Sequence, residues 1–316
     1  MNLTLGEHLN RLFWLLDIIA THGPISLREI NERWIRRSNF MEPINRQVFM
    51  REKETIQEVF GIDIVKVGQN KYKISDPLHN MSRSVHDHML ATIHESNFMS
   101  SFRELGSLIS IPTVYKGSEY LSMIGEALTE GIVLNVMYHK YDAEAYNTEL
   151  VPYCLKLFNR RWYLYAKKQG ENQIKCFSLD RVVDMELSDK KFARDEDFNP
   201  ESFFGNYYGV YLKGDVEDVM IRTTKVSMKF LTDLPLHHSQ RLVNEHDALI
   251  ALQRKGVEYK PKEEYQYYFK FHIAPTPDFE NELLRLCENC EILYPVWFRE
   301  KVHERLLKAV QIMKKD

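Results

Sequence analysis

The spacing between apolar residues changes along the chain, and this change limits the folds that are open to it. In residues 5–20, leucines and isoleucines recur every three or four positions, which is the period of a helix buried on one side. From Ile132 to His139, large apolar residues fall on every second position, as in a half-buried strand. The 316 residues suffice for two or three compact units. We therefore expect a multidomain α+β protein.

Residues 1–75 show three helical segments followed by a hairpin. The second helix starts at a capping box, because Ser26 and Glu29 are spaced so that each can bond a free amide at the helix start. This order predicts a winged helix-turn-helix, in which the third helix enters the major groove of DNA and the hairpin touches phosphates. The three helices are expected over residues 5–20, from the capping box onward and over residues 44–60. The two strands of the hairpin are expected over residues 62–67 and 71–74.

The outer face of the third helix carries side chains suited to base contacts. Arginine can form two hydrogen bonds with guanine, and glutamine can form two with adenine. Lysines of the hairpin contact phosphates whatever the DNA sequence. Residues 1–75 hold eleven Lys and Arg against nine Asp and Glu, so a bundle with solvated charges or a protein-binding module is an open alternative. The opposite face is expected to bury Val48, Phe49, the Glu52 side of the helix, Ile56 and Val59. The predicted DNA contacts are Arg46, Gln47, Arg51, Lys53, Lys71 and Lys73.

Residues 76–117 are predicted to form a helical connector that is rich in histidine. The histidine spacing lacks the i, i+4 pair with a nearby acid that a zinc-binding helix needs. Cys287 and Cys290 form a CxxC pair, but no second pair stands at metal spacing. We therefore expect no metal and no other cofactor. The connector histidines are His79, His86, His88 and His94.

The cysteine content and the apolar segments indicate where the protein works. Four scattered cysteines fit a reducing compartment. No stretch approaches the ~18 apolar residues of a membrane helix, and the amino-terminal segment lacks the features of a signal peptide. We expect a cytoplasmic protein without a membrane partner.

Residues 118–195 are predicted to form a β-rich unit that begins with a short helix at 118–130. Five short strands with tight turns predict a small, strongly bent sheet or an SH3-like β-barrel. By the period of two, Arg161, Tyr163 and Tyr165 share one face, and Trp162 and Leu164 share the other. The expected strands are residues 132–139, 150–158, 161–167, 174–179 and 182–187.

One face of this sheet is predicted to bind an anionic ligand. Lys175 is expected to join Arg161 and Tyr163 there, as is Arg181 if its strand runs on without a bulge. Cations beside aromatic rings suit a nucleotide or a nucleic-acid end. The simpler alternatives are that Arg181 pairs with an acidic neighbour and that Tyr138 lies in the core. The predicted ligand contacts are Tyr138, Arg161, Tyr163, Lys175 and Arg181.

Several motifs in the chain together resemble those of one family. In order they are Arg46-Gln47-Val48-Phe49-Met50-Arg51-Glu52, Tyr138, Pro152, Arg161-Trp162-Tyr163-Leu164, Phe177-Ser178-Leu179-Asp180-Arg181, Leu236-His237-His238-Ser239-Gln240 and Val296-Trp297-Phe298-Arg299. They resemble a DeoR-like winged helix, a WYL domain and the WYL C-terminal extension. The resemblance implies a bacterial transcription factor that usually dimerises, with an Sm-like β-barrel that senses nucleotides or nucleic-acid fragments. Two residues depart from the pattern of the family, because Lys175 lies where the family often has arginine and Glu52 where it more usually has aspartate.

Residues 211–316 alternate strands and helices, which predicts a ferredoxin-like α+β unit. In particular, we expect strands at 218–223, 248–252, 265–273 and 291–294, and helices at 226–231, 277–288 and 295–313. The glycines at 209 and 214 have the spacing of a P-loop, but Asp215 stands where that motif needs lysine, so we reject the match.

These features predict a homodimeric transcription regulator that is not an enzyme. It is expected to bind a two-fold repeated double-stranded DNA operator and to respond to a nucleotide or single-stranded nucleic-acid effector. One alternative is an accessory or regulatory subunit of a nucleic-acid defence or repair system. A less favoured one is a nucleic-acid-processing enzyme, which would need a carboxylate cluster at metal spacing that the sequence does not offer.

Overall fold

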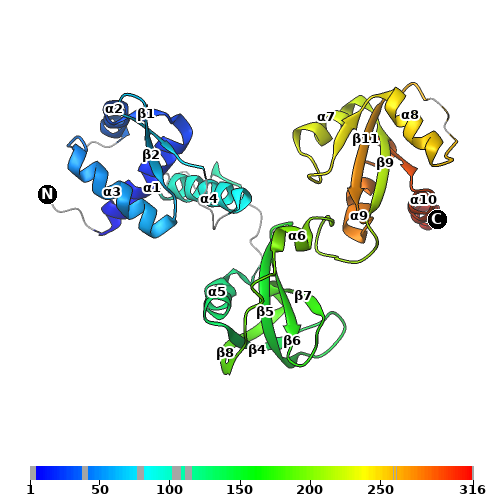
Figure 1. The fold of residues 1–316 in the computed structure, drawn as a ribbon, viewed down its shortest axis with the longest axis horizontal. Coiled ribbons are helices and arrows are strands. Elements are labelled where there is room, and N and C mark those ends of the chain that lie inside the picture. The colour runs from blue at the N-terminus through cyan, green and yellow to red at the C-terminus, as the bar shows by residue number, and fades with distance from the viewer. Residues whose placement is uncertain are drawn as a thin grey trace. The chain divides into compact units, whose positions relative to one another are not determined.

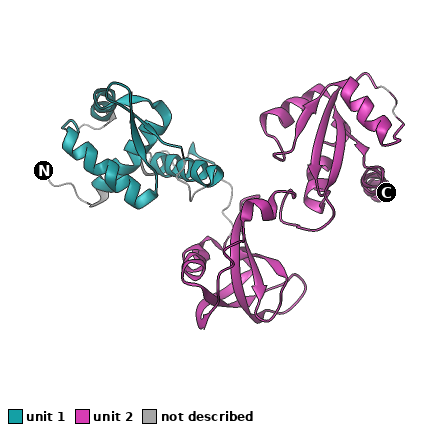
Figure 2. Ribbon diagram, viewed as in Figure 1, with its two compact units in different colours: residues 1–112 teal, residues 113–316 magenta. Residues whose placement is uncertain are grey.

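The computed structural model describes residues 5–37, 42–76, 82–101, 108–110, 116–258, 260 and 262–314. The chain divides into two compact units, residues 1–112 and residues 113–316 (Figure 2). Both units combine helices with antiparallel sheets, which confirms the predicted mixed α+β class. None of the described helices is long and apolar enough to cross a membrane.

The described part of unit 1 has three helices, a three-stranded antiparallel sheet and a fourth helix (Figure 1). The predicted order of three helices and a hairpin is present. The additional strand β1 pairs with β3, and it was missed because two residues are too few to show a period of two. The elements are α1 (Leu5–His22), β1 (Ile25–Ser26), α2 (Leu27–Arg37), α3 (Arg46–Phe60), β2 (Ile64–Val67), β3 (Lys71–Ile74) and α4 (Arg83–Ser101).

Local sequence signals fix the ends of α2 and α3. The capping box forms as predicted, because the Ser26 amide donates to Glu29 Oε2 at 2.8 Å and the Glu29 amide donates to Ser26 Oγ at 3.3 Å. At the start of α3, the Asn45 side chain accepts from the Val48 amide at 2.9 Å. At its end, Gly61 takes the left-handed conformation with φ of +64°.

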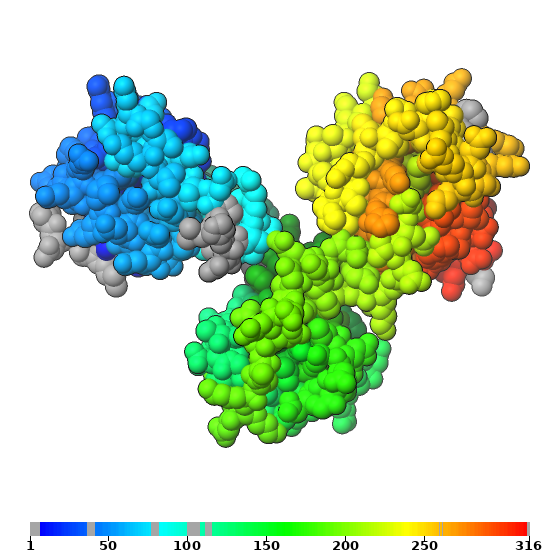
Figure 3. Space-filling view, viewed as in Figure 1, coloured from blue at the N-terminus to red at the C-terminus, as the bar shows by residue number. Residues whose placement is uncertain are grey.

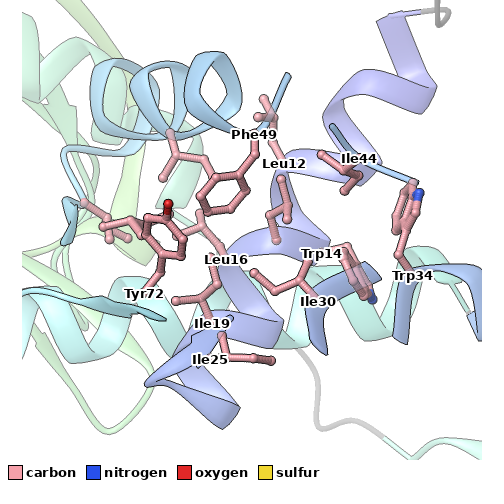
Figure 4. Packing of buried hydrophobic residues seen from close by; sticks show 14 of the residues in the cluster. Leu12, Trp14, Leu16, Ile19, Ile25, Ile30, Trp34, Ile44, Phe49 and Tyr72 are labelled. Carbon is pink, nitrogen blue, oxygen red and sulfur yellow. The ribbon is translucent and has the colours of Figure 1, made fainter. Parts of the chain in front are cut away.

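The helices of unit 1 bury their apolar sides in one core (Figure 4). The ring of Phe49 on α3 lies 4.7 Å from the ring of Tyr72 on β3, which joins the third helix to the hairpin. Val59 was expected in this core and is instead 60% exposed. The last turn of α3 packs through its neighbour Phe60, whose ring lies 5.4 Å from that of Phe13 on α1.

Helix α4 belongs to this unit and does not stand apart as a connector. It buries Ile93 in the core of unit 1. The Asn97 side chain donates to Asp17 Oδ2 on α1 at 2.6 Å, and His94 pairs with the same carboxylate. His79 lies outside the described residues.

Unit 2 begins with a helix packed on an antiparallel sheet of order β7-β6-β5-β4-β8. All five predicted strands are present. Over the fully described residues 116–258, β7 and β8 are the two edges of the ladder, so the sheet lacks the closed hydrogen bonding of a barrel. Ile124 and Ala127 of α5 pack against Leu134 and Leu164 in its core. The elements are η2 (Ser118–Tyr120), α5 (Leu121–Glu130), β4 (Ile132–Tyr138), β5 (Tyr146–Phe158), β6 (Arg161–Lys168), β7 (Ile174–Ser178), η3 (Leu179–Arg181) and β8 (Val182–Lys191).

The segment after β8 packs back on this sheet (Figure 3). The ring of Phe204 in α6 (Pro200–Phe204) lies 4.9 Å from that of Tyr165 on β6. The Tyr165 hydroxyl donates to Val210 O at 2.8 Å, and Lys156 Nζ donates to Gly209 O at 2.6 Å. The segment is therefore a fixed cover over one part of the sheet.

The turn at Gly209 ties this cover to α9. Gly209 has a φ of +86°, and a Cβ there would overlap the Asp278 carboxylate. Asp278 Oδ2 accepts from the amides of Val210 and Tyr211 at 2.7 and 3.1 Å. The backbone amides of the rejected P-loop segment thus bind a carboxylate of the protein itself.

The rest of unit 2 has a sheet of order β10-β11-β9-β12, and its helices and strands follow the order β-α-β-α-β-α-β-α. Without α8 and α10, this is the β-α-β-β-α-β order of the predicted ferredoxin-like unit. Two elements differ from the prediction, because residues 245–254 form a helix and not a strand, and the short strand β10 before them was not predicted. Asn244 caps it by accepting from the Asp247 amide at 2.8 Å, and Ala248 and Leu252 are buried one turn apart. The elements are β9 (Glu217–Thr223), α7 (Lys225–Asp233), β10 (Arg241–Val243), α8 (Glu245–Arg254), β11 (Tyr267–Ile273), α9 (Pro277–Leu284), η4 (Cys287–Asn289), β12 (Cys290–Tyr294) and α10 (Val296–Met313).

Candidate functional site

Helix α3 exposes three of the residues predicted to contact DNA. Arg46, Gln47 and Arg51 are all exposed and lie in the amino-terminal half of the helix. Recognition helices present this half to the base edges. In the other half, Glu54 and Glu58 are exposed, and their charges would repel phosphates. The charge distribution therefore favours DNA contact at the amino-terminal half.

The remaining predicted cations of unit 1 lie elsewhere. Lys53 is only partly exposed, on the flank of α3. Lys71 and Lys73 are exposed on β3 and share one face of the strand, since they are two residues apart. Hydrogen bonds from Ser26, and to a smaller extent the charge of Lys71, lower the pKa of Glu29. Lys71 thus lies near the start of α2.

A buried carboxylate anchors α3 to α1. Glu52 is fully buried, and it ion-pairs with the guanidinium of Arg11. Its other oxygen lies 2.7 Å from His8 Nε2. Arg51, the adjacent candidate DNA contact, keeps a guanidinium nitrogen 3.7 Å from the same carboxylate while its side chain is 67% exposed. Glu52 is therefore a positioning residue for the helix face that carries Arg46 and Gln47.

The strand register decides which predicted ligand residues share a face in unit 2. Tyr163 lies opposite Ser178, so both point to the face that carries Arg161. Lys175 lies opposite Ala166, which packs in the core on the other side of the sheet. The prediction that Lys175 joins Arg161 and Tyr163 on one face is therefore wrong. Its ammonium instead pairs with Glu171 in the β6–β7 turn.

Arg161 and Arg181 meet at the end of this face. Arg161 Nη1 lies 3.9 Å from Asp180 Oδ2. The guanidinium carbon of Arg181 lies 3.3 Å from the ring centre of Tyr141, in the geometry of a cation–π contact. Hydrogen bonds from Arg161 and Arg181 lower the pKa of the Tyr141 hydroxyl. Arg181 Nε is buried and has no hydrogen-bond acceptor among the described residues. An anionic ligand could supply this acceptor.

Tyr138 and Tyr163 lie next to this arginine cluster. Tyr138 is only 5% exposed, and its hydroxyl accepts from the Ser178 amide at 3.1 Å. Burial raises the pKa of Tyr138. Tyr138 therefore fits the core alternative and holds the end of β7, next to η3. Tyr163 is partly exposed beside Arg161, and burial raises its pKa as well.

The places of Tyr141 and Asp180 in the site and the positioning role of Glu52 were not predicted from sequence. Tyr141 lies in the β4–β5 loop, where no periodicity assigns a direction to its side chain. Asp180 lies in the short helix η3, beside the predicted ligand contact Arg181, so the period of two does not apply to it. The partners of Glu52 are more than forty residues away in sequence, and only its place among the buried positions of α3 could have drawn attention to it.

The described residues contain no group of three or more His, Cys, Asp or Glu side chains that could hold a metal. Cys287 is exposed and Cys290 partly buried, and both are free thiols. Burial raises the pKa of Cys290 to about 12, which disfavours the reactive thiolate.

Residues 119–187 match the family model of the WYL domain, so the chain carries a WYL domain at the predicted place. The comparison with curated proteins gave no match. Among solved structures, the chain is similar to proteasome accessory factor B/C (PafBC) of Arthrobacter aurescens, at 15% identity and a TM-score of 0.36, over 98% of this chain and 48% of that one. It thus spans about half the length of that protein. A CRISPR Cas-related protein matches at 9% identity and a TM-score of 0.40, over 100% of this chain and 88% of that one.

Proposed function

We propose that this protein is a ligand-responsive, DNA-binding transcription regulator whose residues 1–75 form a winged helix-turn-helix. The main support for this proposal is the amino-terminal half of α3, where Arg46, Gln47 and Arg51 are exposed to solvent. The caps at Asn45 and Gly61 and the buried Glu52 hold that face in one orientation. The proposal assigns no catalytic step to the chain, and replacing Arg46 and Gln47 by alanine tests whether α3 binds DNA.

The WYL domain is proposed to bind the effector at the cluster of Arg161, Arg181 and Tyr141. Two guanidinium groups and an aromatic ring suit the phosphate and base of a nucleotide or a single-stranded nucleic-acid fragment. An effector changes operator affinity only if it binds the DNA-competent and incompetent states with different affinities.

The effector proposal predicts that Arg161→Ala combined with Arg181→Ala abolishes the response and spares DNA binding without effector. The probe is a mixed pool of short single-stranded DNA, and the readout is its effect on operator affinity in a fluorescence anisotropy titration. Arg194→Ala is the control, because Arg194 is exposed outside the cluster. A double variant that still responds like the parent would place the effector elsewhere.

The regulator is further proposed to work as a homodimer that pairs through α10. The second half of this helix is exposed and carries Leu306, Leu307, Val310 and Met313, which are 44–81% exposed. An apolar stripe of this kind on a water-exposed helix is typical of a protein interface.

Two copies of this stripe would pair about a two-fold axis, because the same surface of each subunit then faces its counterpart. A two-fold dimer would read a two-fold repeated operator.

Leu306→Glu with Val310→Glu should therefore convert the dimer to a monomer in light scattering coupled to size-exclusion chromatography. Charged side chains buried in the interface weaken association by about a hundredfold or more. Leu242→Glu on β10 is the matched control, because Leu242 is also about half exposed but lies outside α10. A parent that is monomeric at all concentrations, or a double variant that stays dimeric, would contradict the α10 interface.

A further inference from the structure

A second concave surface of the WYL region lies between β6–β7 and the segment 203–213. This groove has a volume of about 710 Å³, within the usual range for small-molecule sites. Three lysines line it (Lys167, Lys175 and Lys213), and no carboxylate does. The groove over β4, β5 and β8 has the opposite character, with three carboxylates and no cation in its lining. The lysine groove is thus suited to an anion.

The three lysines differ in how free their charges are. Lys167 Nζ donates to the Tyr153 hydroxyl at 2.5 Å, which leaves it two further protons to donate. Lys175 is held beside Glu171. Lys213 lines the groove and is exposed to solvent. Lys167 and Lys213 therefore provide charge that a ligand with two or more negative charges can use.

The rest of the lining suits an aromatic ring. Tyr211 is 56% exposed, and Phe203 adds a second aromatic wall. Asn172 and Gln173 of the β6–β7 turn supply amides that can donate to and accept from the polar edge of a base. Aromatic side chains stack on bases of any identity.

The groove is separate from the arginine cluster on the same face. Tyr165 lies between them on β6 and is only 2% exposed, because Phe204 and Val210 cover it. A ligand at Arg161 therefore does not continue along the strand into the groove.

From this lining we propose that the groove between β6–β7 and residues 203–213 is a second ligand site, which binds a nucleoside di- or triphosphate. Lys167 and Lys213 bind the phosphates, and Tyr211 stacks on the base. The site lies beside the backbone of Val210 and Tyr211, whose amides are held by Asp278 of α9. Occupancy of the groove thus acts on the contact between the sheet and the carboxy-terminal part of unit 2. The site goes beyond the proposed effector cluster and does not depend on it.

Cys176 makes the site testable, because this exposed thiol lines the groove. Desolvation by the surrounding protein atoms disfavours the thiolate and raises the pKa of Cys176 to about 11. Labelling therefore needs a mildly alkaline buffer. The experiment measures alkylation of Cys176 by N-ethylmaleimide in the full chain, by mass spectrometry, with and without ADP. Cys287 is exposed elsewhere and serves as the internal control.

ADP at ten times its Kd should slow labelling of Cys176 about tenfold and leave Cys287 unchanged. Lys167→Ala with Lys213→Ala should raise the Kd of ADP about tenfold or more, because two charge-assisted hydrogen bonds are lost. Lys168→Ala is the matched control, since it follows Lys167 on β6 and lies over Tyr146, outside the groove. Arg161→Ala with Arg181→Ala should leave the protection intact.

Three outcomes would overturn the proposal. The first is no protection by ADP at millimolar concentration, and the second is protection that the lysine variants keep but the arginine variants lose. The third is equal protection by inorganic pyrophosphate, which would leave no role for the base, whereas adenosine alone is expected to protect poorly. Operator binding in the same samples reports on the regulator proposal separately, so failure of one does not imply failure of the other.

Discussion

Replacing Arg46 and Gln47 together by alanine should lower the affinity for specific DNA by about a hundredfold, because each bidentate base contact contributes about 1–3 kcal/mol of discrimination. Both side chains are exposed on α3 and support nothing in the core, so the fold should be retained. The measurement is a fluorescence anisotropy titration at fixed salt, with a duplex selected by the parent protein from a random library. Fixed salt matters because phosphate contacts make every such affinity salt-dependent.

Gln57→Ala is the matched control for this substitution. Gln57 is exposed on the same helix, but in the half that also carries Glu54 and Glu58. It should change the affinity little. If the Arg46 and Gln47 double variant binds the selected duplex as tightly as the parent, α3 is not the element that reads DNA.

Replacing Glu52 by glutamine should destabilise unit 1 by about 3–5 kcal/mol, the usual cost of breaking a buried ion pair. The carboxylate is fully buried and Arg11 is 12% exposed, so the substitution leaves a guanidinium in the interior without its counter-charge. Arg11 Nε already has no partner among the described residues. Hydrogen exchange with mass spectrometry measures the loss as faster exchange in peptides from α1 and α3.

Two further variants separate charge pairing from a simple change of side chain. Glu58→Gln makes the same chemical change at an exposed position of α3 and should cost less than about 0.5 kcal/mol. Arg11→Met with Glu52→Leu removes both charges and should recover most of the lost stability, since an apolar pair can replace a buried ion pair. Unchanged exchange in Glu52→Gln would mean that the ion pair does not hold α3 in place.

Sequence patterns predicted the parts of the fold that are encoded locally. The capping box at Ser26 and Glu29 forms as expected because its partners are three residues apart and need no tertiary structure. The alternation in β6 placed Leu164 on the face opposite Arg161, also from local spacing alone, and that face packs in the core. Residues 245–254 were misread because Ala248 and Leu252 are also compatible with a short strand, and the Asn244 cap was overlooked.

The candidate site was only partly predictable, because its geometry depends on the register between strands. The pairing of Tyr163 with Ser178 decides on which side of the sheet Lys175 lies. The β6–β7 turn sets this pairing, and the periodicity within one strand does not reveal it. Tyr141 reaches Arg181 from a loop, and loops have no period to read. The groove of Lys167 and Lys213 needs the segment after β8 to fold back on β6, a contact more than forty residues apart in the chain.

Chromatin immunoprecipitation with sequencing can test whether this chain reads DNA sequence through α3. The parent protein and the Arg46→Ala, Gln47→Ala double variant are compared at equal expression in the same cells. We expect discrete peaks with a shared, two-fold repeated motif for the parent, and their loss in the double variant. Enrichment without a shared motif, or the same peaks in both proteins, would contradict it.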